Sequence, residues 1–116
     1  MTLDREELAW AAGFFDGEGH VRFASSGKGP YITLEIKQVA ADPLHRFQRA
    51  IGAGRVNGPY SSTGNKRPYW VYWASSWSDV QIVVALLWKW MGIIKKAQAA
   101  SALSRRIAYG KVHSGQ

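Results

Sequence analysis

The sequence contains no cysteine, so it offers neither a disulfide nor a thiolate ligand for a metal. It also has no apolar run of the ~18 residues that a membrane-spanning helix requires. The N-terminus is polar and acidic, unlike a signal or transit peptide. The three histidines, His20, His45 and His113, are not spaced as zinc ligands. These absences predict a soluble intracellular protein with no membrane partner.

Acidic residues are scarce beyond position 19. Five of the eight acidic residues lie within residues 1–19 beside a single basic one, so 14 of the 15 basic residues follow, with three acids. The formal net charge is +7. A basic body with a local acidic cluster is typical of a protein that binds a polyanion and needs a cation at one point. The alternative is a basic surface that only keeps the protein in solution.

A chain of 116 residues is long enough for one domain, spanning 1–116. Apolar periodicity predicts helices near 4–16, 42–51, 76–91 and 94–108, followed by a frayed tail over 110–116. In the first helix, Asp4 is expected as the N-cap and Glu7 as its capping-box partner; Asp42 is the N-cap expected for the second. Alternating segments at 20–25, 31–38, 55–57 and 69–73 predict two antiparallel hairpins. The order αββαββαα therefore predicts an α+β fold with helices on one face of an antiparallel sheet.

The other face of the predicted sheet carries polar and basic side chains. The outward positions are Arg22, Tyr31, Thr33, Glu35, Lys37, Arg55 and Asn57, and the two hairpin loops add Lys28, Lys66 and Arg67. Such side chains read base edges in the DNA major groove, where Arg and Lys pair with guanine and Glu accepts from cytosine. These residues are the predicted DNA contacts. The alternative is an ordinary solvated face, and the facing of Trp70 and Trp73 stays ambiguous.

Residues 11–19, AAGFFDGEG, place two carboxylates at the end of the first helix. A helix C-terminus concentrates partial negative charge, so an acidic side chain there costs up to roughly 1 kcal/mol when exposed. A divalent cation removes that penalty, which makes Asp16 and Glu18 candidates for a functional site. The alternative is a glycine C-cap followed by a polar turn with solvated acids.

This nonapeptide resembles the motif that names the LAGLIDADG homing endonucleases, and the αββαββα order matches that family's core. The residues that match are Ala12, Gly13, Asp16, Glu18 and Gly19, with Ala11 in place of the first leucine. The resemblance implies a metal-dependent endonuclease that hydrolyses both strands of a long pseudo-palindromic DNA site, with Mg²⁺ or another divalent cation. It also implies a role in intron or intein mobility.

The resemblance assigns roles to individual residues. Glu18 would be the catalytic, metal-binding carboxylate, and Asp16 would tie the helix end to its neighbour. Gln38 would organise water in the active site, although it also fits a residue that simply ends a strand. Lys95 would lie near the scissile phosphate; Lys96 exchanges roles with it if the register is off by one, and a solvated lysine is the alternative.

Only one copy of the motif is present, and the family members with one motif act as homodimers. Small residues at helical spacing let two helices approach closely. Ala9, Ala12 and Gly13 are therefore expected at the dimer interface, together with Asp16. Two rival functions keep the same fold without cleavage: a DNA-binding regulator and an RNA-splicing maturase. Both would retain the basic sheet face and need no metal.

Overall fold

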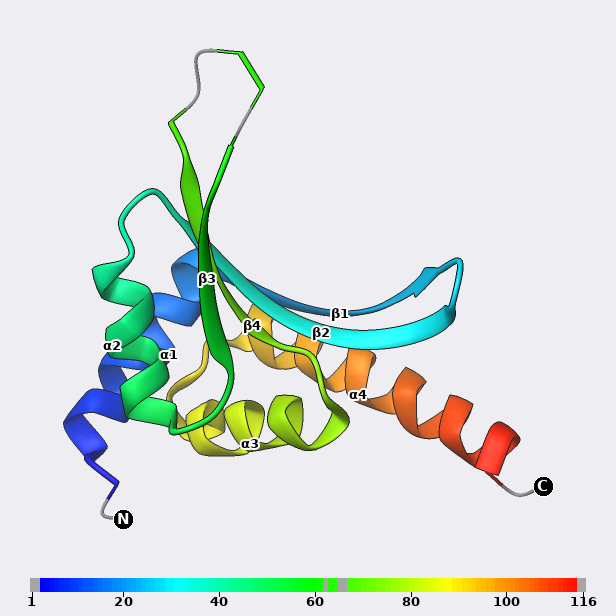
Figure 1. Ribbon diagram of the computed structural model, residues 1–116. Coiled ribbons are helices and arrows are strands. Elements are labelled where there is room, and N and C mark those ends of the chain that lie inside the picture. Colours follow the sequence, from blue (N-terminus) through cyan, green and yellow to red (C-terminus); the bar gives the residue numbers. More distant parts are fainter. Residues whose placement is uncertain (1–2, 62, 65–66, 115–116) are drawn as a thin grey trace.

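The computed structural model describes residues 3–61, 63–64 and 67–114 and shows an α+β fold in two layers (Figure 1). In this part of the chain, no helix is both long and apolar enough to cross a membrane. The elements follow the predicted order. They are α1 (Arg5–Glu18), β1 (Gly19–Ser26), β2 (Gly29–Gln38), α2 (Asp42–Ile51), β3 (Arg55–Tyr60), β4 (Tyr69–Ala74), α3 (Trp77–Leu87), the 3-10 turn η1 (Trp88–Trp90) and α4 (Ile93–Ser114).

The four strands form one antiparallel sheet in the order β1-β2-β4-β3. Both predicted hairpins are confirmed, and β2 and β4 pair with each other at the centre. The helices lie on one side of the sheet, which curves so that its concave face turns away from them (Figure 1). One face is therefore packed and the other is open, as the alternating strands predict.

Helix α1 begins at the predicted cap: the Asp4 side chain accepts hydrogen bonds from the backbone N–H groups of Glu6 and Glu7. The helix continues to Glu18, two residues beyond the expected end. The Glu7 side chain does not form the predicted capping box. Its carboxylate pairs with the Arg46 guanidinium of α2 through two hydrogen bonds, of 3.0 and 2.7 Å. This pair joins the first two helices.

The ion pair with Arg46 lowers the pKa of Glu7, chiefly through its hydrogen bond. Because the folded pKa lies below the unfolded one, the pair stabilises the fold above the ordinary glutamate pKa of about 4.3, and this stabilisation is lost as pH falls through the folded pKa. We expect Glu7→Gln to lower the melting temperature at pH 7. The difference from wild type should shrink between about pH 5 and pH 3.

Thermal unfolding across that pH range measures the effect. Glu6→Gln is the matched control, because it removes the same charge from the next residue, which has no ion pair within the described structure. A Glu7→Gln variant whose melting temperature follows that of wild type at every pH would contradict the expectation.

The N-cap of α2 lies one residue before the predicted one. Asp42 is the first helical residue, and the N-cap is Ala41, which makes no side-chain cap. Asp42 therefore acts through its charge on the positive helix start rather than as a cap. Gly52 ends the helix with a φ of 81°, a left-handed conformation that favours glycine.

Tyr72 of β4 is the largest fully buried side chain and lies where α2 meets the sheet. Its ring packs edge-on against Phe47 with centroids 4.8 Å apart, and its hydroxyl donates to the Ala53 carbonyl at 2.8 Å. Burial raises the pKa of this phenol, so it stays a hydrogen-bond donor. Gly54 combines a φ of 85° with a position where a Cβ would collide with the Tyr72 hydroxyl, so only glycine fits there.

Helix α4 extends to Ser114. The prediction of a frayed tail over 110–116 is therefore wrong for residues 110–114, and residues 115–116 lie outside the described part. Ring contacts explain the extension. Arg105 lies over the Phe23 ring and Arg106 over the Trp77 ring, at 5.5 and 5.0 Å from the centroids. Tyr109 packs against Phe23 with ring centroids 6.0 Å apart. These contacts bind the helix to the sheet and to α3.

Candidate active site at the end of helix α1

Glu18 is the last residue of α1, and its side chain is exposed. It makes no hydrogen bond or ion pair to any residue that the structure describes. The carboxylate thus lies at the negative end of a helix and forms no ion pair with a described residue. This is the environment in which a cation binds favourably.

Gly19 fixes the direction in which the chain leaves the helix. Its φ of −97° is open to any residue, so backbone freedom does not explain the glycine. A Cβ at this position would instead collide with the ring of Phe15, which is buried in the core. Glycine is needed because the aromatic ring occupies the place of a side chain, directly beside Glu18.

We expect Gly19→Ala to destabilise the fold by about 1–3 kcal/mol, because the Phe15 ring or the backbone must move. Chemical denaturation measures the loss. Gly27→Ala, in the β1–β2 turn, has nothing within 4 Å of the added Cβ and serves as the control. Equal stability of the two variants would show that the Phe15 contact does not constrain this position.

Asp16 ties α1 to the start of α4, the structural role that the resemblance implies. Both of its carboxylate oxygens accept from the backbone N–H of Gly92, at 3.1 and 2.9 Å. The contact joins residues 76 positions apart. Asp16 is thus engaged within its own chain, whereas Glu18 is not.

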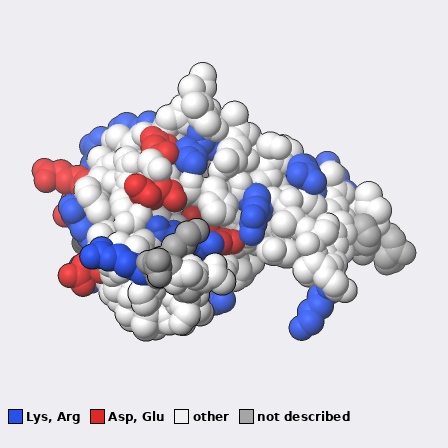
Figure 2. Space-filling model, turned by 90° about the horizontal axis from the view of Figure 1, so that it is seen from above, with Lys and Arg blue, Asp and Glu red and all other residues white. Residues whose placement is uncertain are grey.

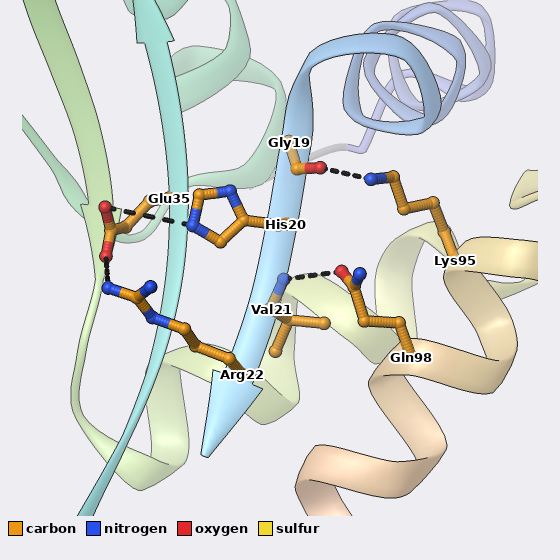
Figure 3. A network of polar contacts seen from close by, with 7 residues as sticks. All are labelled: Gly19, His20, Val21, Arg22, Glu35, Lys95 and Gln98. Atoms are coloured by element: carbon orange, nitrogen blue, oxygen red, sulfur yellow. Dashed lines mark hydrogen bonds and ion pairs between the residues drawn. The ribbon is translucent and has the colours of Figure 1, made fainter. Parts of the chain in front are cut away.

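Two side chains of α4 satisfy the outer edge of β1, as Figure 3 shows. Lys95 donates from its Nζ to the Gly19 carbonyl, and Gln98 accepts from the Val21 N–H at 2.9 Å. Residues three apart share a helix face. The Gly19 carbonyl and the Val21 N–H, two residues apart in the strand, both point away from β2 at the free edge of the sheet. Lys95 is therefore held at Gly19, the residue that follows Glu18.

Lys96 takes a different direction: its Nζ lies over the Trp88 ring, 5.4 Å from the centroid. Of the two lysines that the sequence leaves open, Lys95 is the one placed beside the motif. Sequence reasoning missed Gln98, although its i, i+3 relation to Lys95 is a signal that points both residues to one neighbour.

Gln38 is the last residue of β2 and is half-buried. Gly19 pairs with Ile36, so β2 extends two residues past the start of β1. Lys37 and Gln38 therefore lie at the end of the sheet where α1 arrives. The register brings Gln38 to the same end as Glu18, without a contact between the two side chains.

A buried acid underlies the open face beside this site. Glu35 is 5% exposed and pairs with Arg22 at 3.4 Å, with His20 Nε2 4.0 Å from its other oxygen (Figure 3). Burial lowers the pKa of His20, Glu35 opposes the shift, and the positive charges of Arg22, Lys95 and Lys37 add to it. Imidazole and guanidinium thus converge on one carboxylate between β1 and β2.

The strand registers place the seven predicted outward residues on one face: Arg22, Tyr31, Thr33, Glu35, Lys37, Arg55 and Asn57. Thr33 and Glu35 are nevertheless buried, at 2% and 5% exposure, so their prediction as direct DNA contacts is wrong. Both belong to β2, an inner strand of the sheet, so residues of β1 and β4 flank them on the two sides. Glu35 instead orients Arg22.

The hairpin loops carry further basic residues. Lys28 is exposed in the β1–β2 turn, and Arg67 is exposed just before β4; Lys66 lies outside the described residues. In a view from above, onto the open face, the visible acidic side chains gather toward the end formed by α1 and α2 (Figure 2). Toward the β1–β2 hairpin only Lys and Arg are seen (Figure 2). In this view the acidic side chains are therefore unevenly distributed, whereas basic side chains appear over its whole length.

The dimer stripe expected on α1 requires one correction. Ala12 is fully buried against the chain's own core, so it cannot line an interface with a second chain. Its i+3 and i+7 relation to Leu8 and Phe15 turns it inward. Gly13 and Gly17 are exposed with nothing within 4 Å of an added Cβ, and Ala9 lies one turn before them. The small residues at the surface are Ala9, Gly13 and Gly17.

Within the described part of one chain, acidic and histidine side chains do not form a complete metal site. Among the described residues, no group of three or more carboxylate, imidazole or thiol side chains is arranged to hold an ion. Glu18 is a hard oxygen donor suited to Mg²⁺, and it is free to bind. The remaining ligands must come from water, from a phosphate, or from a second chain.

Aromatic side chains of β4 line a part of the open face that the sequence left undecided. Trp73 pairs with Glu35 and so lies on the open face, whereas Trp70 faces the helices, 6.4 Å from the His45 ring. Tyr69 and Val71 share the face of Trp73. Their alternation, Tyr-x-Val-x-Trp, is the signal that sequence reasoning did not use.

No protein-family model matches the chain, and no curated protein matches it. Solved structures do. The homing endonuclease I-CvuI, in complex with its target in the presence of calcium, superposes with a TM-score of 0.67 at 21% identity, over 86% of this chain and 65% of that one. An archaeal intron-encoded homing endonuclease complexed with DNA gives 0.66 at 21% identity, over 92% and 69%. The group I intron-encoded I-CeuI, also with DNA, gives 0.66 at 11% identity, over 99% and 58%.

Proposed function

Because the chain has the fold of the LAGLIDADG homing endonucleases, we propose that it is a site-specific DNA endonuclease that acts as a homodimer with a divalent metal. The observation that carries the proposal is the unpaired Glu18 carboxylate at the end of α1, adjoining a concave basic face. The chain spans about two thirds of the length of I-CvuI, so its activity and partners are proposals in their own right.

The metal requirement explains why one chain is not enough. Two Glu18 side chains from two copies of α1 would hold the cation, since like charges at close range are tolerated only with a bound ion. When bound, Mg²⁺ polarises a phosphoryl oxygen and activates water for hydrolysis of the phosphodiester. Lys95 places a positive charge at the carbonyl of Gly19, the residue after Glu18, and fixes the first peptide of β1. That charge stabilises the negative charge that develops on the phosphate.

The exposed face of α1 supports pairing of two chains. Ala9, Gly13 and Gly17 recur every four residues and so form one stripe of small residues. Glycine inside a helix costs about 1 kcal/mol relative to alanine. Close packing against a second helix would offset that loss of stability. A two-fold dimer of this kind would bind a pseudo-palindromic site.

The concave face would lie in the major groove. Arg22, Lys37, Arg55 and Asn57 reach out from the strands, and Lys28 and Arg67 extend the basic surface toward the loops. Contacts to phosphates would give the affinity its dependence on salt, and contacts to base edges would give sequence preference.

The test is cleavage of a randomised duplex library by the full chain, with Mg²⁺ and with a chelator, followed by sequencing of the ends. The proposal requires Mg²⁺-dependent breaks in both strands at a nearly symmetric site. Salt-dependent binding of duplex DNA without breaks would favour the regulator. Binding of structured RNA in its place would favour the maturase.

A further inference from the structure

The open face contains a hollow of about 300 Å³, and half of the residues that line it are aromatic. Its floor is formed by Tyr69, Val71 and Trp73 of β4, which alternate along the strand and so face the same way. Tyr31 from β2 and Tyr60 from β3 complete the wall, each 39% exposed. An apolar hollow thus occupies the surface that the proposed function assigns to DNA.

Basic side chains surround this apolar floor. Arg22 lies on the β1 side, where the buried Glu35 carboxylate holds it at 3.4 Å. Lys37 lies over the Tyr69 ring, 5.3 Å from the centroid. The guanidinium and ammonium groups can pair with guanine or phosphate, whereas the side chains of the β4 floor carry no charge. Glu35, the one acid among the residues that line the hollow, is paired with Arg22. The hollow therefore selects for an apolar group within a polyanion.

In the major groove, the only apolar group on a base edge is the C5 methyl of thymine. A donor or acceptor of another base placed against the ring faces of this floor, away from the tyrosine hydroxyls, would lose water without gaining a partner, which is unfavourable. The methyl group, in contrast, gains from leaving water. Shape and polarity together identify the group that fits.

We propose that this hollow reads one or two neighbouring thymine methyl groups in each half-site, and that Tyr69 and Trp73, between which Val71 is buried, are the residues that set this preference. The inference rests on the proposed function, because it requires duplex DNA on the open face. Arg22, oriented by Glu35, reads or anchors the base pair next to the thymine. The expected substrate is therefore duplex DNA that carries thymine at a fixed position in each half-site.

The experiment begins with sites that the full chain selects by binding from randomised duplex DNA. In a selected duplex, each thymine is replaced in turn by deoxyuridine, which lacks only the methyl group, and dissociation constants are measured by fluorescence anisotropy. At one or two neighbouring positions per half-site we expect roughly fourfold weaker binding, the value for one buried methyl. In duplexes that carry cytosine at those positions, replacing it by 5-methylcytosine should strengthen binding by a similar factor.

Protein variants connect the effect to the hollow. Tyr69→Ser, at the half-exposed end of the floor, should remove the difference between thymine and deoxyuridine, while Trp88→Ser, an exposed aromatic on η1, should preserve it. A selected site without such a thymine, or one whose thymines all tolerate deoxyuridine at unchanged affinity, overturns this inference and leaves the proposed function standing. Failure to bind any duplex overturns both.

Discussion

Glu18→Gln is expected to abolish DNA cleavage, with a loss of roughly a thousandfold or more, while the fold and the binding of DNA are retained. The carboxylate is exposed and contacts no described residue, so its removal breaks no contact of the fold. The substitution also removes a negative charge from the helix end, which favours the folded chain slightly. Loss of activity at unchanged stability would therefore identify a functional carboxylate.

Cleavage rates and dissociation constants of the two proteins on the same selected duplex give this comparison. Glu6→Gln is the control, because it changes an exposed glutamate at the opposite end of α1. A Glu18→Gln protein that cuts DNA at the wild-type rate would exclude Glu18 from the reaction. A variant that loses its melting transition would show instead that Glu18 is structural.

Gly13→Leu is expected to separate folding from dimerisation. The leucine meets nothing within its own chain near its Cβ, and it replaces the poorest helix former after proline, so the monomer should gain up to about 1 kcal/mol. In a two-fold dimer, the same leucine enters the interface from both chains. Overpacking there costs about 1–3 kcal/mol per site, which weakens association by roughly a hundredfold.

Analytical ultracentrifugation and thermal unfolding measure the two effects side by side. Ala108→Leu, which also adds a leucine to an exposed helix position, is the control and should change neither property much. A Gly13→Leu chain that sediments like wild type would move the interface away from α1. It would leave the role of Glu18 without its second carboxylate.

Sequence reasoning predicted the order of the elements because each carries a local signal. The strand alternation of Ile32, Leu34 and Ile36 marks the buried face of β2, and Asp4 marks the start of α1. It failed where tertiary contacts determine the partner of a side chain or the end of a helix. Glu7 pairs with Arg46 across two helices, and the last turns of α4 are held by Phe23, far from them in sequence.

The candidate site shows the same division. The motif identified Glu18 and Asp16 directly, since two acids at a helix end are visible in the sequence. The burial of Thr33 and Glu35 depends on sheet curvature and on neighbouring strands, which no local pattern encodes. Ala12 likewise turned inward because the phase of the helix is set by the whole core.

The central claim is that one exposed carboxylate becomes a metal site only when two chains pair. Its most direct test is a crystal structure of the full chain with a selected DNA duplex and Ca²⁺ or Mn²⁺, in which the metal is located by its anomalous scattering. The account predicts two chains related by a two-fold axis, with metal bound between the paired Glu18 side chains. Metal bound elsewhere, or Glu18 facing solvent in each chain, would contradict it.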